Sequence, residues 1–267
     1  ADGFNATSNG SSLMTLIVGG AGAGEDNIIS ENIGAGLSLN VNSSSFMSAD
    51  VTNNIMNFNG DDGTSLTLNG SSNFTGTFTD NTMNNNGARG FDYTANGSNG
   101  SRIDPVDIIL TGNEFKTNDL EGIRVVTDAN LNQNRSVLLS NTGFPSDNRL
   151  PPYNPLDPAF TGTPGYEADF LNLFTTQATN LIVTNNTIRD NGNGVDSHGM
   201  LMQIGTSTYV AADVQNNVFG GNVLSDFRTE GFLSAGSPSA SVNNSGSGTF
   251  DIVFLDDTAQ LDLRFNL

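Results

Sequence analysis

Asparagines recur in pairs along this chain at a nearly regular interval. Six asparagines are each followed by a second asparagine five residues later. The pairs are Asn27 and Asn32, Asn54 and Asn59, Asn81 and Asn86, Asn113 and Asn118, Asn186 and Asn191, and Asn217 and Asn222. With Asn141, which fits the series less well, successive first asparagines lie 27, 27, 32, 28, 45 and 31 residues apart. A repeat of this length cannot bury its apolar face alone and must stack on copies of itself.

Large apolar residues accompany the asparagines at fixed positions. One follows each first asparagine by two residues, and in five of the six repeats another precedes it by three. Around Asn113, residues 106–110 alternate as a strand, residues 111–113 form a turn, and Phe115 returns to the interior. A polar turn and a further strand from Gly122 follow. Each coil therefore contains two or three short strands joined by polar corners.

A coil of about 27 residues is too long for a left-handed hexapeptide helix and lacks the consensus of leucine-rich repeats. It suits an all-β right-handed parallel β-helix, in which strands of successive coils pair about 4.8 Å apart. We predict one β-solenoid over residues 1–267, with about eight to nine coils. Asparagines at the corners would hydrogen-bond from coil to coil and tolerate a left-handed backbone. The predicted ladder is Asn27, Asn54, Asn81, Asn113, Asn141, Asn186 and Asn217.

The motif Asn-x-φ-x-x-Asn, followed by Gly-φ-x-φ, resembles the parallel β-helix repeats of the pectate-lyase-like superfamily. The resemblance covers nearly the whole chain, and it is greatest to the repeat arrays in large secreted surface proteins of planctomycetes and related bacteria. It implies a β-helix fold and an extracellular or cell-surface location. The superfamily includes lyases, hydrolases, epimerases, tailspikes, adhesins and inert stalks, so the fold alone does not fix the function.

The composition excludes several classes of function. The formal net charge is −19, which argues against nucleic acid and anionic membranes as partners because neither would attract this chain. The chain has no cysteine, so disulfides and thiol chemistry play no part. No apolar stretch is long enough to span a bilayer, and we predict no membrane insertion.

One stretch interrupts the repeat, between Asn141 and Asn186. It holds six of the eight prolines and a cluster of aromatic residues. We predict an insertion loop over about residues 144–180, with Tyr153, Phe160 and Tyr166 as candidate ligand-binding residues. Sugars and partner proteins both pack on aromatic rings. Alternatively, the loop folds back and covers one flank of the solenoid.

A few polar residues are candidates for chemistry. Asp61 and Asp62 lie in a loop whose carboxylate and amide oxygens could bind Ca²⁺, although solvated turn acids are the simpler interpretation. The only histidine, His198, follows Asp196 and Ser197 in a segment that faintly resembles the histidine motif of polygalacturonases. The paired acidic motifs and the basic motif of those enzymes are missing. We therefore predict no catalytic residue and treat His198 as an ordinary turn residue.

The carboxyl end, about residues 242–267, is predicted to be a terminal coil or cap. Residues 250–254 and 261–265 both alternate as strands, with a turn expected at residues 256–258. Exposed strand edges at both ends would favour continuation in a longer chain or end-to-end stacking of identical units. A hairpin cap is the alternative.

Together these features predict a non-enzymatic extracellular structural or surface protein, a rod or fibre subunit whose partner is itself or neighbouring repeats. The alternative is a carbohydrate-active enzyme of the lyase or hydrolase type, or a glycan-binding adhesin, that holds a polysaccharide beside the 144–180 loop. A trimeric adhesin is a third option. Ca²⁺ is the only cofactor that the sequence suggests.

Overall fold

The computed structural model describes residues 1–22, 24–96, 106–127, 178–192, 198–204, 209–233, 243–245 and 250–265. Every regular element within these ranges is a β-strand, and every named strand pair is parallel. The described part of the chain contains no helix long and apolar enough to cross a membrane. The protein is therefore all-β with parallel sheets.

The strands form two main sheets and a shorter third ladder. Sheet A contains β1 (Phe4–Ser8), β3 (Leu37–Val41), β5 (Thr64–Asn69), β7 (Phe91–Asn96), β10 (Ile123–Thr127), β13 (Met200–Ile204) and β15 (Phe227–Leu233). Sheet B contains β2 (Leu13–Gly19), β4 (Phe46–Thr52), β6 (Asn73–Thr79), β8 (Val106–Thr111), β11 (Ala178–Thr184) and β14 (Tyr209–Gly220). The third ladder contains β9 (Glu114–Lys116) and β12 (Thr187–Arg189) and ends on β14, with β16 (Asn243–Ser245) beyond it; β17 (Phe250–Phe265) joins sheets A and B.

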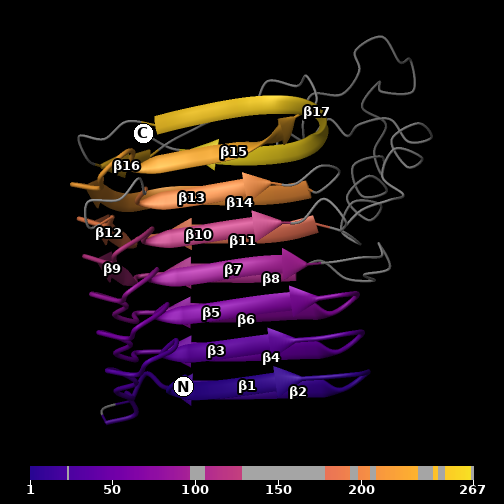
Figure 1. Ribbon diagram of the computed structural model, residues 1–267, viewed down its shortest axis with the longest axis vertical. Helices are drawn as coiled ribbons and strands as arrows, with labels where there is room; N and C mark the ends of the chain where they lie inside the picture. Colours follow the sequence, from indigo (N-terminus) through magenta and orange to yellow (C-terminus); the bar gives the residue numbers. More distant parts are fainter. Residues whose placement is uncertain are drawn as a thin grey trace.

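Successive strands of one sheet stack as layers along the long axis, from β1 and β2 to β17 (Figure 1). A layer is one strand of sheet A with the next strand of sheet B and the corner that follows. The register does not slip in the lower layers: Leu39 pairs with Ala6 on one side and with Leu66 on the other. Strict register is expected where one face is buried, because a slip of one residue would turn the apolar side chains outward.

The core lies between the sheets and consists of stacked inward side chains. In β3, Leu37, Leu39 and Val41 are buried while the residues between them are half-exposed. Phe78 packs edge-on against Phe91 with ring centroids 4.9 Å apart, so sheets A and B meet through aromatic contacts. Burial of each such side chain contributes about 1.5–3 kcal/mol.

The layer order departs from the prediction in the middle of the chain. β8 pairs directly with β11, and Leu110 lies opposite Val183. No layer can lie between these two strands, so the repeat predicted around Asn141 has no place there; Asn141 itself lies outside the described residues. β11 begins at Ala178, inside the range predicted as loop. The predicted loop therefore ends before Ala178, and the rest of its range lies outside the described residues.

The carboxyl end also differs from the expected strand, turn and strand. Residues 256–258, predicted to turn, lie inside the single strand β17. Its first part pairs in parallel with β15, with Phe250 opposite Phe227, and its last part pairs in parallel with β14, with Phe265 opposite Val214. One strand therefore passes from sheet A to sheet B, and both pairings are parallel, unlike those of a hairpin.

Candidate functional site

Asn81 illustrates how the corner asparagines connect the layers. Its backbone N–H and its Nδ2 both donate to Oδ1 of Asn113, at 2.9 and 3.0 Å, and Nδ2 also donates to the carbonyl of Val51 at 2.8 Å. Its own Oδ1 accepts two hydrogen bonds from Asn54, at 2.9 and 3.1 Å. The side chain is 1% exposed, yet all of its polar atoms have partners. A buried amide costs no free energy of desolvation when it is satisfied in this way.

Six of the seven predicted ladder residues form one such column, and the seventh, Asn141, lies outside the described residues. The first column is Asn27, Asn54, Asn81, Asn113, Asn186 and Asn217. The second asparagines of the pairs form a column of their own, a role that was not predicted for them. The second column is Asn32, Asn59, Asn86, Asn118, Asn191 and Asn222. The five-residue spacing was the signal for this second column.

At every described corner except that of Asn27, the left-handed backbone belongs to the residue before the asparagine, contrary to the prediction that the asparagine adopts it. Before the first column these residues suit that conformation, because Asn, Asp and Gly adopt positive φ most readily. They are Asn53, Asp80, Gly112, Asn185 and Asn216, with φ of 57°, 53°, 70°, 58° and 54°. The residue before the asparagine makes the turn, and the asparagine then points inward to its counterparts.

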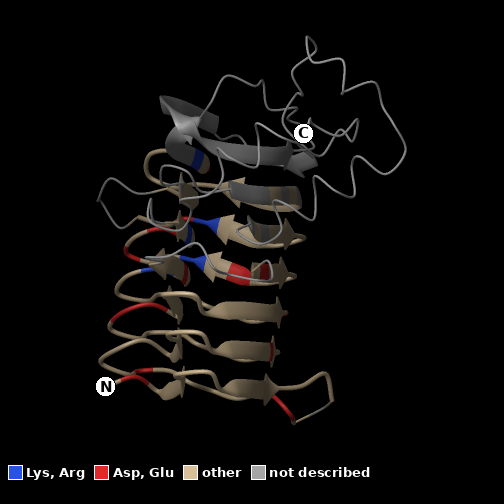
Figure 2. Ribbon diagram, turned by 90° about the vertical axis from the view of Figure 1, so that its right-hand side faces the viewer, with Lys and Arg blue, Asp and Glu red and all other residues tan. Residues whose placement is uncertain are grey.

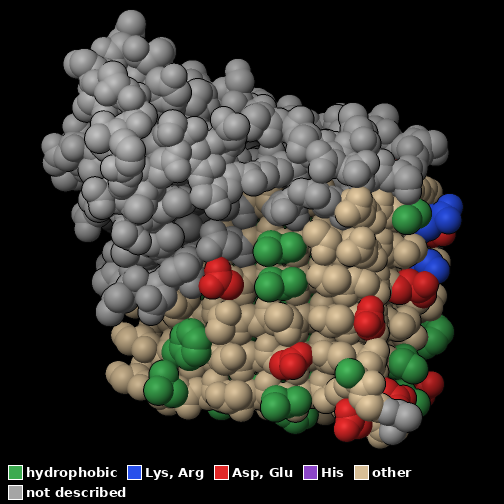
Figure 3. Space-filling model, turned by 180° about the vertical axis from the view of Figure 1, so that it is seen from behind, with side chains coloured by type: hydrophobic (Ala, Val, Ile, Leu, Met, Phe, Trp, Pro, Cys, Tyr) green, Lys and Arg blue, Asp and Glu red, His purple; other side chains and the backbone are tan. Residues whose placement is uncertain are grey.

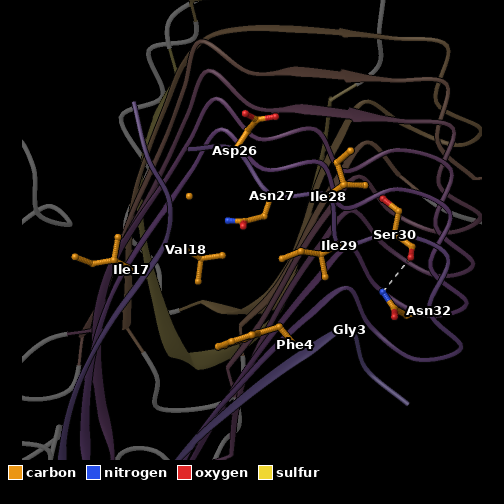
Figure 4. Close-up of a pocket in the computed structure, with 11 residues that line it drawn as sticks. Gly3, Phe4, Ile17, Val18, Asp26, Asn27, Ile28, Ile29, Ser30 and Asn32 are labelled. Carbon is orange, nitrogen blue, oxygen red and sulfur yellow. Dashed lines mark hydrogen bonds between the residues drawn. The ribbon is translucent and has the colours of Figure 1, made fainter. Parts of the chain in front are cut away.

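The first layer is open on the side away from the second layer. A pocket of about 660 Å³ lies there, lined by the inward residues Phe4, Val18 and Ile29 together with Asn27 and Asn32. Figure 4 shows Phe4, Val18, Asn27 and Ile29 directed into this shared space. Among the described residues, no donor reaches Oδ1 of Asn27, although Asn27 donates to Asn54 at 2.9 Å. The columns thus begin with free acceptors.

The second candidate site is the charged corner: Asp62, Arg89, Asp92, Glu121 and Arg124. The basic residues of the described chain lie on layers distant from the amino terminus, beside acidic ones (Figure 2). Nε of Arg89 lies 2.9 Å from Glu121, while its Nη1 lies 3.7 Å from Asp62 in the layer below. Arg124 donates from Nε and Nη2 to the two carboxylate oxygens of Asp92, at 2.6 and 3.0 Å. Each ion pair joins two adjacent layers.

Burial and neighbouring charges shift the pKa values of Asp62 and Arg124 in the charged corner. Asp62 is only 4% exposed, and this burial, with the nearby charge of Asp92, raises its pKa to about 7. Arg89 opposes the shift but does not cancel it, because its guanidinium is shared with the closer Glu121. Burial of Arg124 by itself would lower its pKa, but the hydrogen bonds to Asp92 together with the negative charges of Asp92, Glu121 and Asp62 outweigh burial and raise it. A carboxyl that titrates near neutrality thus lies beside an ion pair.

His198 extends the charged corner by one layer. It precedes Gly199 as Glu121 precedes Gly122, and Ile123 N–H donates to the carbonyl of Gly199, so the two corners are stacked. Nδ1 of His198 lies 2.6 Å from Oγ of Ser225, and both residues are buried. A buried hydroxyl offers a substrate no access. The neighbouring Asp196 and Ser197 lie outside the described residues.

The other predicted site residues do not gather into one site. Asp61 is exposed, whereas the buried Asp62 accepts a hydrogen bond from the backbone N–H of Arg89 at 3.0 Å. Within the described ranges no group of three or more His, Cys, Asp or Glu residues is arranged to hold a metal ion. Calcium binding at Asp61 and Asp62 stays a prediction. The aromatic candidates Tyr153, Phe160 and Tyr166 lie outside the described residues.

Sequence reasoning missed the charged corner. Its members come from different repeats and differ in residue type, so they leave no period in the sequence. One sequence pattern could have indicated the charged corner: Asp62, Arg89 and Glu121 each stand directly before a glycine, at equivalent positions of successive repeats. Comparisons with protein-family models, with curated proteins and with solved structures found no match to this chain.

Proposed function

We propose that this chain is a right-handed parallel β-helix with a structural, non-enzymatic function, as a rod or fibre segment at the cell surface or outside the cell. The observation that supports this proposal best is the continuity of the two asparagine columns from layer to layer. Parallel strands joined by crossovers are right-handed in about 98% of cases, which favours that hand here.

A structural role fits the way in which the side chains are used. The amides of both columns form hydrogen bonds with neighbouring layers, and the inward apolar side chains pack in the core. Since each layer contacts only its neighbours, such a body lengthens by about 4.8 Å per added layer without changing its cross-section. The charge of −19 favours solubility of a long particle. Its partner is itself or further repeats, and bound Ca²⁺ would stiffen the turn at Asp61.

Far-ultraviolet circular dichroism and small-angle X-ray scattering test the architecture. We expect a β-sheet spectrum and the scattering of an elongated particle. A strong α-helical signal or a compact sphere would contradict the proposal. Turnover of polysaccharides by lyase or hydrolase assays would contradict the non-enzymatic function even if the rod is found.

A carbohydrate-active enzyme is the second candidate, and the charged corner favours it. A carboxyl whose pKa is raised toward neutrality is the kind of group that serves as a general acid in glycoside hydrolysis. Asp62, with a pKa of about 7, would be the acid, and the charge of the nearby Asp92 contributes to that pKa. Assays on neutral and acidic polysaccharides should compare the parent chain with Asp62→Asn. Turnover that disappears in this variant would favour the enzyme over the rod.

A further inference from the structure

The lower edge of the first layer is unpaired within the described residues. There β1 pairs only with β3, and β2 pairs only with β4. Met14 and Leu16 point inward but are only partly buried, whereas their partners in β4, Met47 and Ala49, are buried. Phe4 is 40% exposed although its partner Leu37 is fully buried. This edge thus presents backbone groups and core side chains that another layer would cover.

The opposite end is formed by one strand that belongs to both sheets. β17 pairs with β15 in sheet A and with β14 in sheet B, and the described residues add no strand of these sheets beyond it. The two sheets that begin at β1 and β2 therefore end together at β17, with all strands in the same direction. If β1 and β2 of a second copy were placed against the free edge of β17, both sheets would continue from one copy into the next.

The asparagine columns have a direction. In every step the asparagine of the lower layer donates through its backbone N–H and Nδ2, and Oδ1 of the next layer accepts. The first layer offers free acceptors at Asn27. Two first layers brought face to face would oppose acceptor to acceptor, so contact between like ends is disfavoured.

We propose, on the basis of the structural role proposed above, that copies of this chain stack head to tail: β17 of one copy pairs in parallel with β1 and β2 of the next. The contact buries the pocket lined by Phe4 and Ile29 and covers the first layer, where Oδ1 of Asn27 has no donor among the described residues. Because the two contacting surfaces differ, the contact does not close, and it generates a filament. Among the described atoms of the side seen in Figure 3, the hydrophobic side chains form small separate groups, several of them on the lowest layers.

Cysteine cross-linking tests the direction of stacking, since the chain has no cysteine of its own. Thr15 and Asp262 occupy the same position of sheet B at opposite ends, and head-to-tail stacking in register would make them neighbours. The register connects Thr15, Ser48, Thr75, Asp107, Asn180, Ala211 and Asp262. We expect a short bismaleimide to link Thr15→Cys to Asp262→Cys when the two variants are mixed, and neither variant to itself. Linking of Thr15→Cys alone, or no linking in the mixture, would overturn the proposal.

Two leucines of β2 provide a matched pair for sedimentation velocity. Leu16→Lys places a charge on the inward side of the open layer, which should weaken self-association roughly tenfold or more. Leu13 faces outward and is 83% exposed, so Leu13→Lys should associate like the parent chain. Circular dichroism verifies that both variants fold. If the parent chain is an elongated β-rod by scattering but stays monomeric at high concentration, head-to-tail stacking is wrong and the proposed structural role survives.

Discussion

The asparagine columns and the charged corner bury polar groups in two different ways. In the first column the same residue type recurs in every described layer, and each amide bonds to an identical amide. In the charged corner the sign alternates from layer to layer, with Asp62 below Arg89 and Arg89 below Glu121. Both lie at corners of the same stack.

The difference follows from the chemistry of the groups. An amide carries both a donor and an acceptor, so identical amides one layer apart complement each other. Identical charges one layer apart repel, so a column of charges must alternate, and each member depends on the neighbour beneath and above it. A neutral column can therefore be extended by any number of layers, whereas a charged one is specific to its place.

The largest predicted effect comes from removing the donors of one amide. In the parent chain, Nδ2 of Asn81 donates to Oδ1 of Asn113 and to the carbonyl of Val51. Asn81→Asp replaces this donor with a buried carboxylate oxygen, which faces the same two acceptors. We expect a loss of about 3–5 kcal/mol in the free energy of unfolding at pH 8. Asn27→Asp makes the same change in the exposed first layer and should cost only about 1 kcal/mol. Urea denaturation measures both; equal losses would mean that the column does not stabilise the interior.

The first asparagine column could be predicted from the sequence for the same reason that it is stable. Because every layer needs the same residue, the requirement appears as a period. The apolar alternation around Asn113 likewise follows from a strand with one buried face. The period also predicted a ladder residue at Asn141, which lies outside the described residues; in the described column Asn113 bonds directly to Asn186. The sequence pattern did not predict the pairing of β8 with β11, because that pairing joins residues far apart in the chain.

The charged corner could not be predicted in this way. Arg89 contacts Asp62 and Glu121 at separations of 27 and 32 residues, and the residue type changes at each step. The left-handed turn was expected at the asparagine but lies one residue earlier, as at Asp80 before Asn81. The repeat in the sequence shows that an asparagine is needed at each corner. It does not show that the preceding residue, such as Asp80, adopts the left-handed conformation, because the geometry of the corner determines that.

The second largest effect is a dependence on pH that the neutral columns lack. The pKa of Asp62 is raised from 3.8 to about 7, so the folded state holds its proton more tightly than the unfolded state. Its contribution is most favourable below about pH 4 and is lost as the pH rises through about 7, for a total of as much as about 4 kcal/mol. Asp62→Asn should remove this loss, because the amide oxygen still accepts from the backbone N–H of Arg89.

Urea denaturation at several values between pH 4 and 8 checks the role of Asp62. The free energy of unfolding of Asp62→Asn should exceed that of the parent chain increasingly toward pH 8. Asp26→Asn removes the same charge from an exposed residue that does not contribute to the shift, and it serves as the control. If the free energies of unfolding of Asp62→Asn and the parent chain differ by the same amount at every pH in this range, burial does not raise the pKa of Asp62.

A smaller effect is expected from the ion pair between Arg124 and Asp92. Arg124→Leu leaves the buried carboxylate of Asp92 without its partner and should cost about 2 kcal/mol. Layers above and below show which neutral residues fit: Leu201 is opposite Arg124, and Ser65 is opposite Asp92. The double variant Asp92→Ser with Arg124→Leu should therefore recover most of the loss in thermal or urea denaturation. If the losses of Asp92→Ser and Arg124→Leu simply add in the double variant, Asp92 and Arg124 are not energetically coupled, and the expected recovery is wrong.

The smallest effect concerns the turn before the second column, which is less well suited than the turn before the first. Phe58, directly before Asn59, has a φ of 58° and is 60% exposed. The equivalent residue in the next layer is Asn85, with a φ of 55°. A bulky residue in this conformation costs about 1 kcal/mol that asparagine largely avoids, so Phe58→Asn should raise the free energy of unfolding by about 0.5–1 kcal/mol. Phe58→Ala removes the same ring but keeps the unfavourable conformation and should give no such gain; an equal gain from both variants would assign the effect to the exposed ring instead of the backbone.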